Sequence, residues 1–333
     1  MMVPRIGTFG EKNMSIEILR HPPKVSLLSF KNGTPEEKKE FIDKLFYGLK
    51  EFGSVLLTDH GLEEINVEKA YDRIEDFFNL PEEEKMKHCH KEYSGQRGYT
   101  PFGKEKAKGN KVADLKEFWH VGRELPKEHR YIETKTYFEN VWPKSIPDFK
   151  EDLCSIYGLL DEVSRDLLSA IEVALDAPKN FLTDMVFEGN SILRGIHYPK
   201  LSGGETKGAL RAAAHGDINL ITLMVGPTDS GLEILDRKGK NWVPVNSFTT
   251  EIEVHVGDML SRITNEIIPS SIHRVVNPTD ENKARYSMPF FVHPAPEAVL
   301  NCIPSCIGKG AKYPPITSHA FLMERLKDIN LVY

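Results

Sequence analysis

The sequence predicts an α+β protein with a mainly β core, a double-stranded β-helix (jelly roll) flanked by helices. Three observations predict it. From residue 190 onward the chain consists of short apolar, β-branched runs separated by turns. Helical patterns lie before that point and at the C-terminal end. Eight short strands form a barrel that can hold a ligand inside, which suits the His, Asp and Arg side chains that these strands carry.

The region 1–180 is expected to be a helical and strand region that packs on the barrel. After an irregular lead-in over 1–20, residues 25–30 read as a short strand. Thr34 is the predicted N-cap of the next helix, with Pro35 in the first turn and Glu37 closing a capping box. Gly53 ends this helix, and 54–58 form a strand.

Two further helices follow in the same region. The first carries Ile74, Phe77 and Phe78 and ends before Pro81. The second is long and has apolar residues three or four positions apart from Phe149 to Ala174, which indicates a helix packed against the sheet.

The barrel is expected over 181–312, and 313–333 should form a C-terminal helix on its outside. The predicted strands share short length and alternating or continuous apolar character: 192–198, 212–225, 231–235, 242–245, 252–256, 259–264, 272–276 and 286–293. Turns are expected at 236–240 and at Gly257-Asp258.

The run 212–225 carries the first candidate site. His215 and Asp217 are two positions apart, so a strand places both side chains on one face, and Ile221, Leu223 and Val225 are expected to continue that face inward. A carboxylate and an imidazole at the end of an apolar strand need a partner, for which a divalent cation is the natural choice.

A third ligand must come from elsewhere in the chain. His273, in another β-like run, is the best candidate, and two His with one carboxylate are the facial triad of non-haem Fe(II) oxygenases. Arg285 and Ser287 follow on one face of the next predicted strand. Arginine offers a planar two-pronged donor for a carboxylate, and serine adds a hydroxyl.

These motifs in this order resemble the 2-oxoglutarate- and iron(II)-dependent dioxygenases, and more narrowly the isopenicillin N synthase-like subgroup. Segments 51–61, 77–81 and 97–101, and then 114–117, are also similar to that subgroup, so the resemblance spans nearly the whole chain. His255 is a rival third ligand, but it does not occupy the family's position and is treated as a bystander.

The resemblance implies that Fe(2+) binds to His215, Asp217 and His273, with no catalytic residue beyond the metal centre. It implies that the cosubstrate 2-oxoglutarate binds to Arg285 and Ser287, and that Tyr198 adds a hydrogen bond. Ile196 stands where plant members carry an Asn, so that contact is absent.

The implied reaction is the hydroxylation, desaturation or ring formation of a small-molecule substrate. It consumes O2 and releases succinate and CO2, and ascorbate is an optional further cofactor. One alternative is an isopenicillin N synthase-like oxidase that uses O2 without 2-oxoglutarate. Another is a non-catalytic jelly-roll protein that binds a metal or ligand. Succinate release coupled to O2 uptake separates the three.

Bulk properties exclude some partners. The net charge of −6, from 43 basic and 49 acidic residues, argues against nucleic acid. No apolar run is long enough for a membrane span, and residues 1–12 lack the apolar core of a signal peptide. The four cysteines form no disulfide framework, so a cytoplasmic protein is expected. The polar loop 104–111 has two interpretations: a plain solvated loop, or, as the resemblance to the family implies, a segment near the mouth of the substrate pocket.

Overall fold

The computed structural model describes residues 21–106, 112–205, 207–236, 240–245, 250–279 and 281–328. The predicted lead-in over 1–20 lies outside these ranges. So do residues 107–111 of the 104–111 loop, most of the turn at 236–240 and the last residues of the predicted C-terminal helix.

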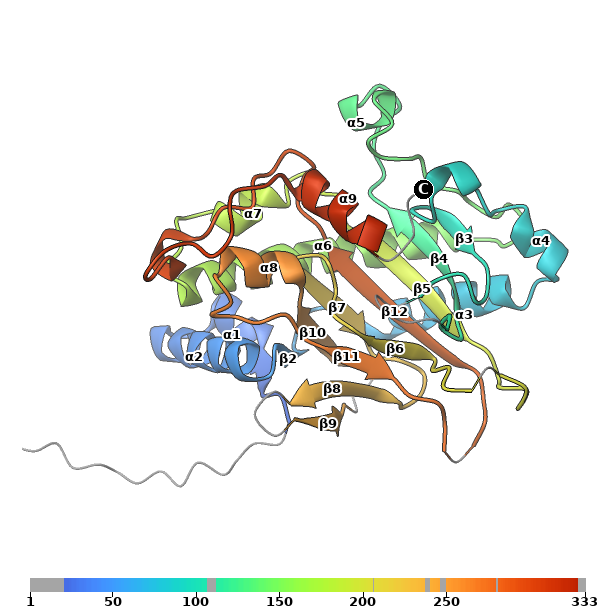
Figure 1. The fold of residues 1–333 in the computed structure, drawn as a ribbon, viewed down its shortest axis with the longest axis horizontal. Coiled ribbons are helices and arrows are strands. Elements are labelled where there is room, and N and C mark those ends of the chain that lie inside the picture. Colours follow the sequence, from blue (N-terminus) through green and yellow to red (C-terminus); the bar gives the residue numbers. More distant parts are fainter. Residues whose placement is uncertain are drawn as a thin grey trace, which may run out of the picture.

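The helices differ widely in length (Figure 1). They are α1 (Leu27–Asn32), α2 (Pro35–Glu51), α3 (Glu64–Phe78), α4 (Glu82–Met86), α5 (Arg130–Glu133), α6 (Phe149–Ala174), α7 (Phe181–Met185), α8 (Asp258–Ile263) and α9 (Ser318–Asp328). The strands before the barrel are β1 (Lys24–Ser26), β2 (Ser54–Thr58), β3 (Gly98–Thr100) and β4 (Glu117–Gly122). Those of the barrel are β5 (Ile192–Tyr198), β6 (Ala212–His215), β7 (Ile221–Val225), β8 (Leu232–Asp236), β9 (Asn241–Pro244), β10 (Ile252–Val256), β11 (His273–Val275) and β12 (Arg285–Val292).

The strands form two sheets that face each other. The larger sheet has the order β1-β2-β10-β7-β12-β5-β4-β3, and the smaller has the order β6-β11-β8-β9 (Figure 1). The central neighbours of both sheets, such as β7 with β12 and β6 with β11, are far apart in sequence, which is typical of a jelly roll. The predicted jelly roll with flanking helices is confirmed.

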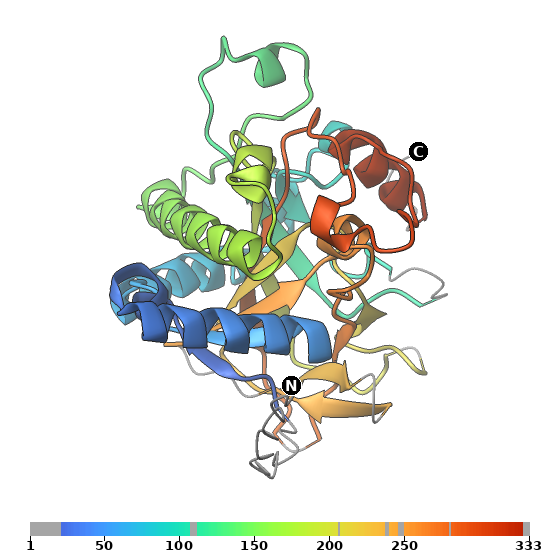
Figure 2. The same ribbon diagram turned by 90° about the vertical axis from the view of Figure 1, so that its left-hand side faces the viewer.

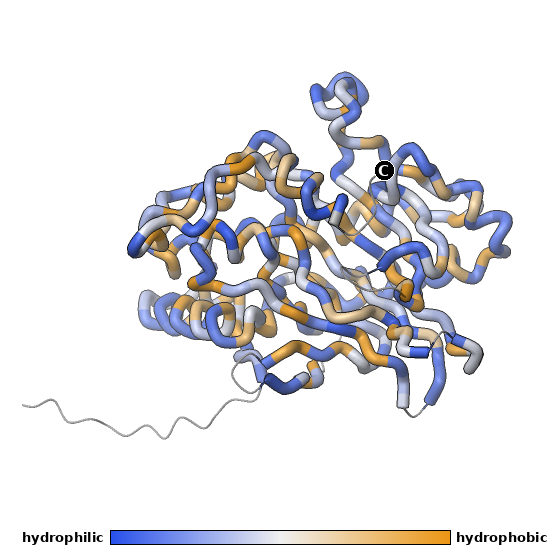
Figure 3. Tube along the Cα trace, viewed as in Figure 1, coloured by the Kyte–Doolittle hydropathy of each residue, from blue (hydrophilic) through white to orange (hydrophobic). Residues whose placement is uncertain are grey.

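The long helices cover the outer face of the larger sheet. α2 and α6 lie side by side there, and α3 packs on α6 and β5 (Figure 2). The capping box at Thr34 forms as predicted, with Glu37 N donating to the Thr34 hydroxyl and Thr34 N donating to Glu37. Apolar residues of α6 and of the central strands share one core (Figure 3). Within the residues that the structure describes, no helix is both long and apolar enough to cross a bilayer.

The prediction of one strand over 212–225 is wrong. β6 belongs to the smaller sheet and β7 to the larger, so the chain crosses between sheets in this stretch. The backbone between them bonds to another segment instead: Asp258 N donates to Asp217 O at 2.7 Å, and Gly257 N donates to Leu220 O at 2.9 Å. Asp217 therefore lies in the connection and not on the strand of His215.

The predicted facing of β7 is also wrong. Ile221, Leu223 and Val225 pack in the core beneath the helices, whereas Met224 lines the interior of the barrel. The strand is buried on both faces, and a continuous apolar run does not reveal which face looks inward.

Two other predicted strands differ from the structure. Residues 259–264 lie mainly in helix α8, with Met259, Leu260 and Ile263 buried at helical spacing. The run 25–30 divides between β1 and helix α1. Apolar runs of this length fit either type of element, so periodicity alone does not separate them.

Candidate active site

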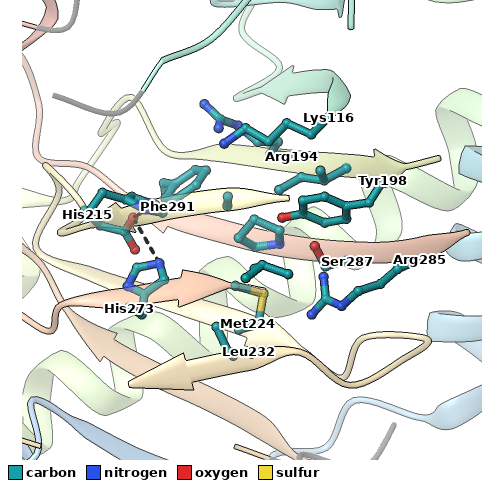
Figure 4. A pocket seen from close by; sticks show the side chains of 15 residues that line it. Lys116, Arg194, Tyr198, His215, Met224, Leu232, His273, Arg285, Ser287 and Phe291 are labelled. Carbon is teal, nitrogen blue, oxygen red and sulfur yellow. Dashed lines mark ion pairs between the residues drawn. The ribbon is translucent and has the colours of Figure 1, made fainter. Parts of the chain in front are cut away.

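Three side chains predicted as metal ligands converge inside the barrel. His215 ends β6 and His273 begins β11, and the two are register partners in the smaller sheet. Asp217 reaches the same place from the connection after β6. One ligating atom from each residue lies within 4.8 Å of the others (Figure 4). Oδ1 of Asp217 is 3.8 Å from Nε2 of His215 and 3.9 Å from Nε2 of His273.

Local hydrogen bonds orient two of these side chains. Nδ1 of His215 donates to the carbonyl oxygen of Ala213 at 2.7 Å, so the lone pair of Nε2 is free to ligate a metal. The hydroxyl of Thr222 donates to Oδ2 of Asp217 at 2.5 Å, which leaves Oδ1 pointing at the two imidazoles. Each residue thus directs one unused electron pair toward a common point.

The protonation states also suit a cation. Burial raises the pKa of Asp217, but the neighbouring His273 and His215 outweigh it and hold that pKa below its usual value. Burial and then His215 keep the pKa of His273 well below its usual value. An ionised carboxylate and a neutral imidazole are the forms that ligate a metal. The donor set of two imidazoles and one carboxylate therefore fits Fe(II).

A second group lies at the other end of the interior, on adjacent strands of the larger sheet. Arg285 on β12 and Tyr198 on β5 are register partners, and Cζ of Arg285 is 5.1 Å from the centre of the tyrosine ring. Ser287 follows on the same face of β12.

Polar atoms of this second group are buried without partners. Arg285 is 1% exposed, and its Nε donates to the carbonyl oxygens of Asp229 and Ser230 at 3.0 and 3.1 Å. Its Nη1 and the hydroxyl of Ser287 have no partner in the part of the chain that the structure describes. Unpaired buried donors are costly, and a ligand carboxylate would satisfy both.

A cavity of about 430 Å³ joins the two groups. All six predicted site residues line it: His215, Asp217, His273, Arg285, Ser287 and Tyr198. His255 does not line it. Its Nε2 lies 2.9 Å from Oε1 of Glu253, and its ring packs behind that of His273 with 4.5 Å between ring centres.

Lys116, Arg194 and Phe291 are among the residues of the cavity wall that were not predicted as site residues from the sequence. A signal existed for two of them. Arg194 is four positions from Tyr198 and Phe291 is six from Arg285, so strand alternation places them on the inward faces. Lys116 precedes β4, which was not predicted. It lies in the segment 114–117 that resembles the family, but that resemblance did not assign it to the cavity.

Two family models match the chain. Residues 23–145 match the model described as non-haem dioxygenase in morphine synthesis N-terminal, and residues 189–294 match the 2OG-Fe(II) oxygenase superfamily. The second match contains the converging His and Asp residues and the Arg285 group.

Known proteins are similar over most of their length. The chain is 32% identical to the 2-oxoglutarate-Fe(II) type oxidoreductase ppzD of Metarhizium rileyi, over 89% of this chain and 88% of that protein. It is 29% identical to the 2-oxoglutarate-Fe(II) type oxidoreductase hxnY of Emericella nidulans, over 89% and 86%.

Solved structures agree with these matches. A putative 2OG-Fe(II) oxygenase family protein from Caulobacter crescentus has a TM-score of 0.81 and 38% identity, covering 92% of this chain and 98% of that one. A full-length Neurospora crassa protein in complex with alpha-KG and thymine also has a TM-score of 0.81, with 25% identity and coverage of 92% and 96%.

Proposed function

The chain belongs to the 2OG-Fe(II) oxygenase superfamily, in its isopenicillin N synthase-like subgroup, and we propose that His215, Asp217 and His273 hold its Fe(II). It is a 2-oxoglutarate-dependent dioxygenase that oxidises a small-molecule substrate with O2 and releases succinate and CO2. Fe(2+) and 2-oxoglutarate are its cofactors.

One observation carries the ligand assignment. Three potential ligand atoms lie within 4.8 Å of one another, and two of the three side chains are oriented by hydrogen bonds to their other polar atom. Fe(II), when bound, supplies the centre at which O2 is activated beside the substrate. Three protein ligands leave the remaining coordination positions for small molecules.

Arg285, Ser287 and Tyr198 bind the far carboxylate of 2-oxoglutarate in this proposal. The unpaired Nη1 of Arg285 and hydroxyl of Ser287 supply donors, and the buried guanidinium supplies the charge. Apolar side chains of Leu232, Met224 and Val275 also line the cavity. They exclude water from the path between the cosubstrate carboxylate and the metal.

An isopenicillin N synthase-like oxidase was the nearest alternative, because the Arg and Ser could bind a substrate carboxylate instead. The relatives are 2-oxoglutarate-dependent enzymes, which supports the 2-oxoglutarate reaction over the oxidase and over a non-catalytic protein. The optional requirement for ascorbate stays a prediction.

The ligand assignment is tested by O2 uptake and succinate release. The iron-loaded parent enzyme should convert 2-oxoglutarate to succinate slowly even when its primary substrate is absent. Asp217→Ala should abolish this conversion. Succinate formation at the parent rate in this variant would place the iron elsewhere.

We also propose that 181–312 form the catalytic barrel, with 1–180 and 313–333 packed around it. The enzyme is proposed to act in the cytoplasm, where its four free cysteines stay reduced. A fluorescent fusion excluded from the cytoplasm would contradict that location.

A further inference from the structure

A second cavity, of about 240 Å³, shares no residue with the cavity that holds the metal ligand candidates. Its walls come from the segment after α5, the turn after β12, the first turn of α9, and Asn190 in front of β5 (Figure 1). Tyr137, Pro294 and Leu322 supply apolar surface, and polar side chains complete the lining. The proposed binding of iron and 2-oxoglutarate uses none of these residues.

A buried guanidinium lies behind one wall of this cavity. Arg97 is 1% exposed, and its Nη2 donates to Oδ1 of Asn190 at 3.2 Å, while its Nη1 donates to the carbonyl oxygen of Gln96 at 2.7 Å. In the described ranges its Nε has no partner, and no carboxylate forms an ion pair with it. Glu124 acts on Arg97 from a greater distance and is itself paired with Lys150 at 2.9 Å. A buried cation of this kind is costly unless an anion balances it.

Three polar side chains offer unused hydrogen-bonding groups to the cavity. Because Oδ1 of Asn190 accepts from Arg97, its Nδ2 is directed away from the guanidinium, and Nδ2 has no partner among the residues that the structure describes. The hydroxyl of Ser318, a residue that is 3% exposed, likewise has none there.

His293 is the third of these side chains. It is 8% exposed, and its Nδ1 is buried without a partner in the described part of the chain. Burial lowers the pKa of His293 to about 4, so its ring is uncharged at neutral pH and carries one N–H donor. An amide, a hydroxyl and an imidazole thus present donors in front of a buried cation.

The other charges near the cavity leave room for an anion. Glu188 lies 3.3 Å from His129, and Glu297 is paired with Arg130 at 2.6 Å, so these carboxylates already have partners. The first turn of α9 faces the cavity, and the dipole of this helix of 11 residues places partial positive charge there. The one unbalanced charge is that of Arg97, which a single negative charge would balance.

We propose that this cavity binds a small monovalent anion such as chloride. Nδ2 of Asn190, the hydroxyl of Ser318 and the ring of His293 hold the anion, which balances the charge of Arg97. The anion connects the end of β12 with α9 and so fastens the C-terminal helix to the barrel. This inference does not depend on the proposed function, because none of these residues contributes to the iron or 2-oxoglutarate site.

The test is thermal unfolding of the full chain, loaded with Mn(II) and 2-oxoglutarate, in sodium chloride or in sodium gluconate. Equal ionic strength keeps general screening the same, and gluconate is a much larger anion than chloride. We expect chloride to raise the midpoint of unfolding by about 2 °C or more, because it binds the folded state.

Asn190→Asp supplies an internal anion in place of chloride. Its carboxylate replaces the oxygen that accepts from Arg97 and removes the Nδ2 donor. The variant should therefore lose the response to chloride without a lower midpoint in gluconate. Ser318→Ala, which removes one donor, should weaken the response. Asn301→Asp, at an exposed position outside the cavity, is the matched control and should respond as the parent does.

A crystal of the parent protein grown in sodium bromide locates the anion by anomalous scattering. We expect a bromide peak within hydrogen-bonding distance of Asn190 and Ser318. Equal midpoints of the parent in chloride and gluconate would overturn the proposal, as would an undiminished chloride response in Asn190→Asp. Bromide peaks at the metal centre or on the surface, with none in this cavity, would also overturn it.

Discussion

Nε2 of His273 lies 3.9 Å from Oδ1 of Asp217, although the two residues are far apart in sequence. The pairing of β6 with β11 produces this proximity by placing His273 opposite His215. The three side chains bring a buried carboxylate and two imidazoles together in one corner of the cavity. Such a group is stabilised by a divalent cation.

Removing a ligand should remove iron. We expect His215→Ala and Asp217→Ala to bind no Fe(II), because each leaves only two protein ligands. Anaerobic titration followed by metal analysis measures the stoichiometry, which should be one iron per parent chain. His319→Ala, which alters an exposed histidine, is the control. Full iron binding by Asp217→Ala would disprove the assignment.

Arg285→Ala should weaken 2-oxoglutarate binding and spare iron. The buried guanidinium is the main charge at its end of the cavity, and a lost charge-assisted hydrogen bond lowers affinity by about 10- to 100-fold. Anaerobic titration of the iron-loaded protein with 2-oxoglutarate gives the affinity. Unchanged affinity would mean that the cosubstrate carboxylate lies elsewhere.

Glu105→Gln should destabilise the fold in a pH-dependent way. The folded-state pKa of Glu105 is lowered from its ordinary value of 4.5, so its ionised form stabilises the protein above that value, and the stabilisation is lost as the pH falls. The free energy of unfolding of the variant should be lower by about 2 kcal/mol or more at pH 7, because Arg194 and Lys116 lose their shared charged partner.

The difference in the free energy of unfolding between parent and Glu105→Gln should be about 1 kcal/mol smaller at pH 4 than at pH 7. Urea unfolding of the metal-free parent and variant at both pH values measures it. Glu162→Gln, at an exposed position of α6, controls for the change in net charge. A difference that grows as the pH falls would contradict the predicted sign.

Glu172→Ala should also destabilise the protein. The buried carboxylate of Glu172 accepts hydrogen bonds from the backbone N–H groups of Asn180, Leu182 and Thr183 at 3.1, 2.8 and 2.9 Å, and so caps the start of α7. Its removal leaves these donors unpaired, at a cost of about 2–4 kcal/mol. Urea unfolding tests this, with Glu162→Ala as control. A loss equal to that of the control would show that water replaces the carboxylate.

The sequence predicted the chemistry of the site better than the path of the backbone. His215, Asp217 and His273 meet as expected, but the reason given for the first two was wrong, since Asp217 lies in a connection between sheets. Residue types and their order indicated the site, whereas hydrogen bonds to the segment at Asp258 break the strand. Those long-range bonds leave no local signal.

The cavity wall illustrates a different limit. Strand alternation placed Arg285 and Ser287 inward, and the same rule would have found Arg194 and Phe291. Their neighbours Glu105 and Lys116 come from a loop and from the start of an unpredicted strand. Only the packing of β4 against β5 brings them to Arg194.

The most direct test of the account is a crystal structure with Mn(II) in place of iron and with 2-oxoglutarate bound, using anomalous scattering to locate the metal. We predict one metal peak within bonding distance of His215, Asp217 and His273, with the far carboxylate of 2-oxoglutarate on Arg285 and Ser287. A metal peak outside these three residues, or a cosubstrate carboxylate on Arg194, would contradict the account.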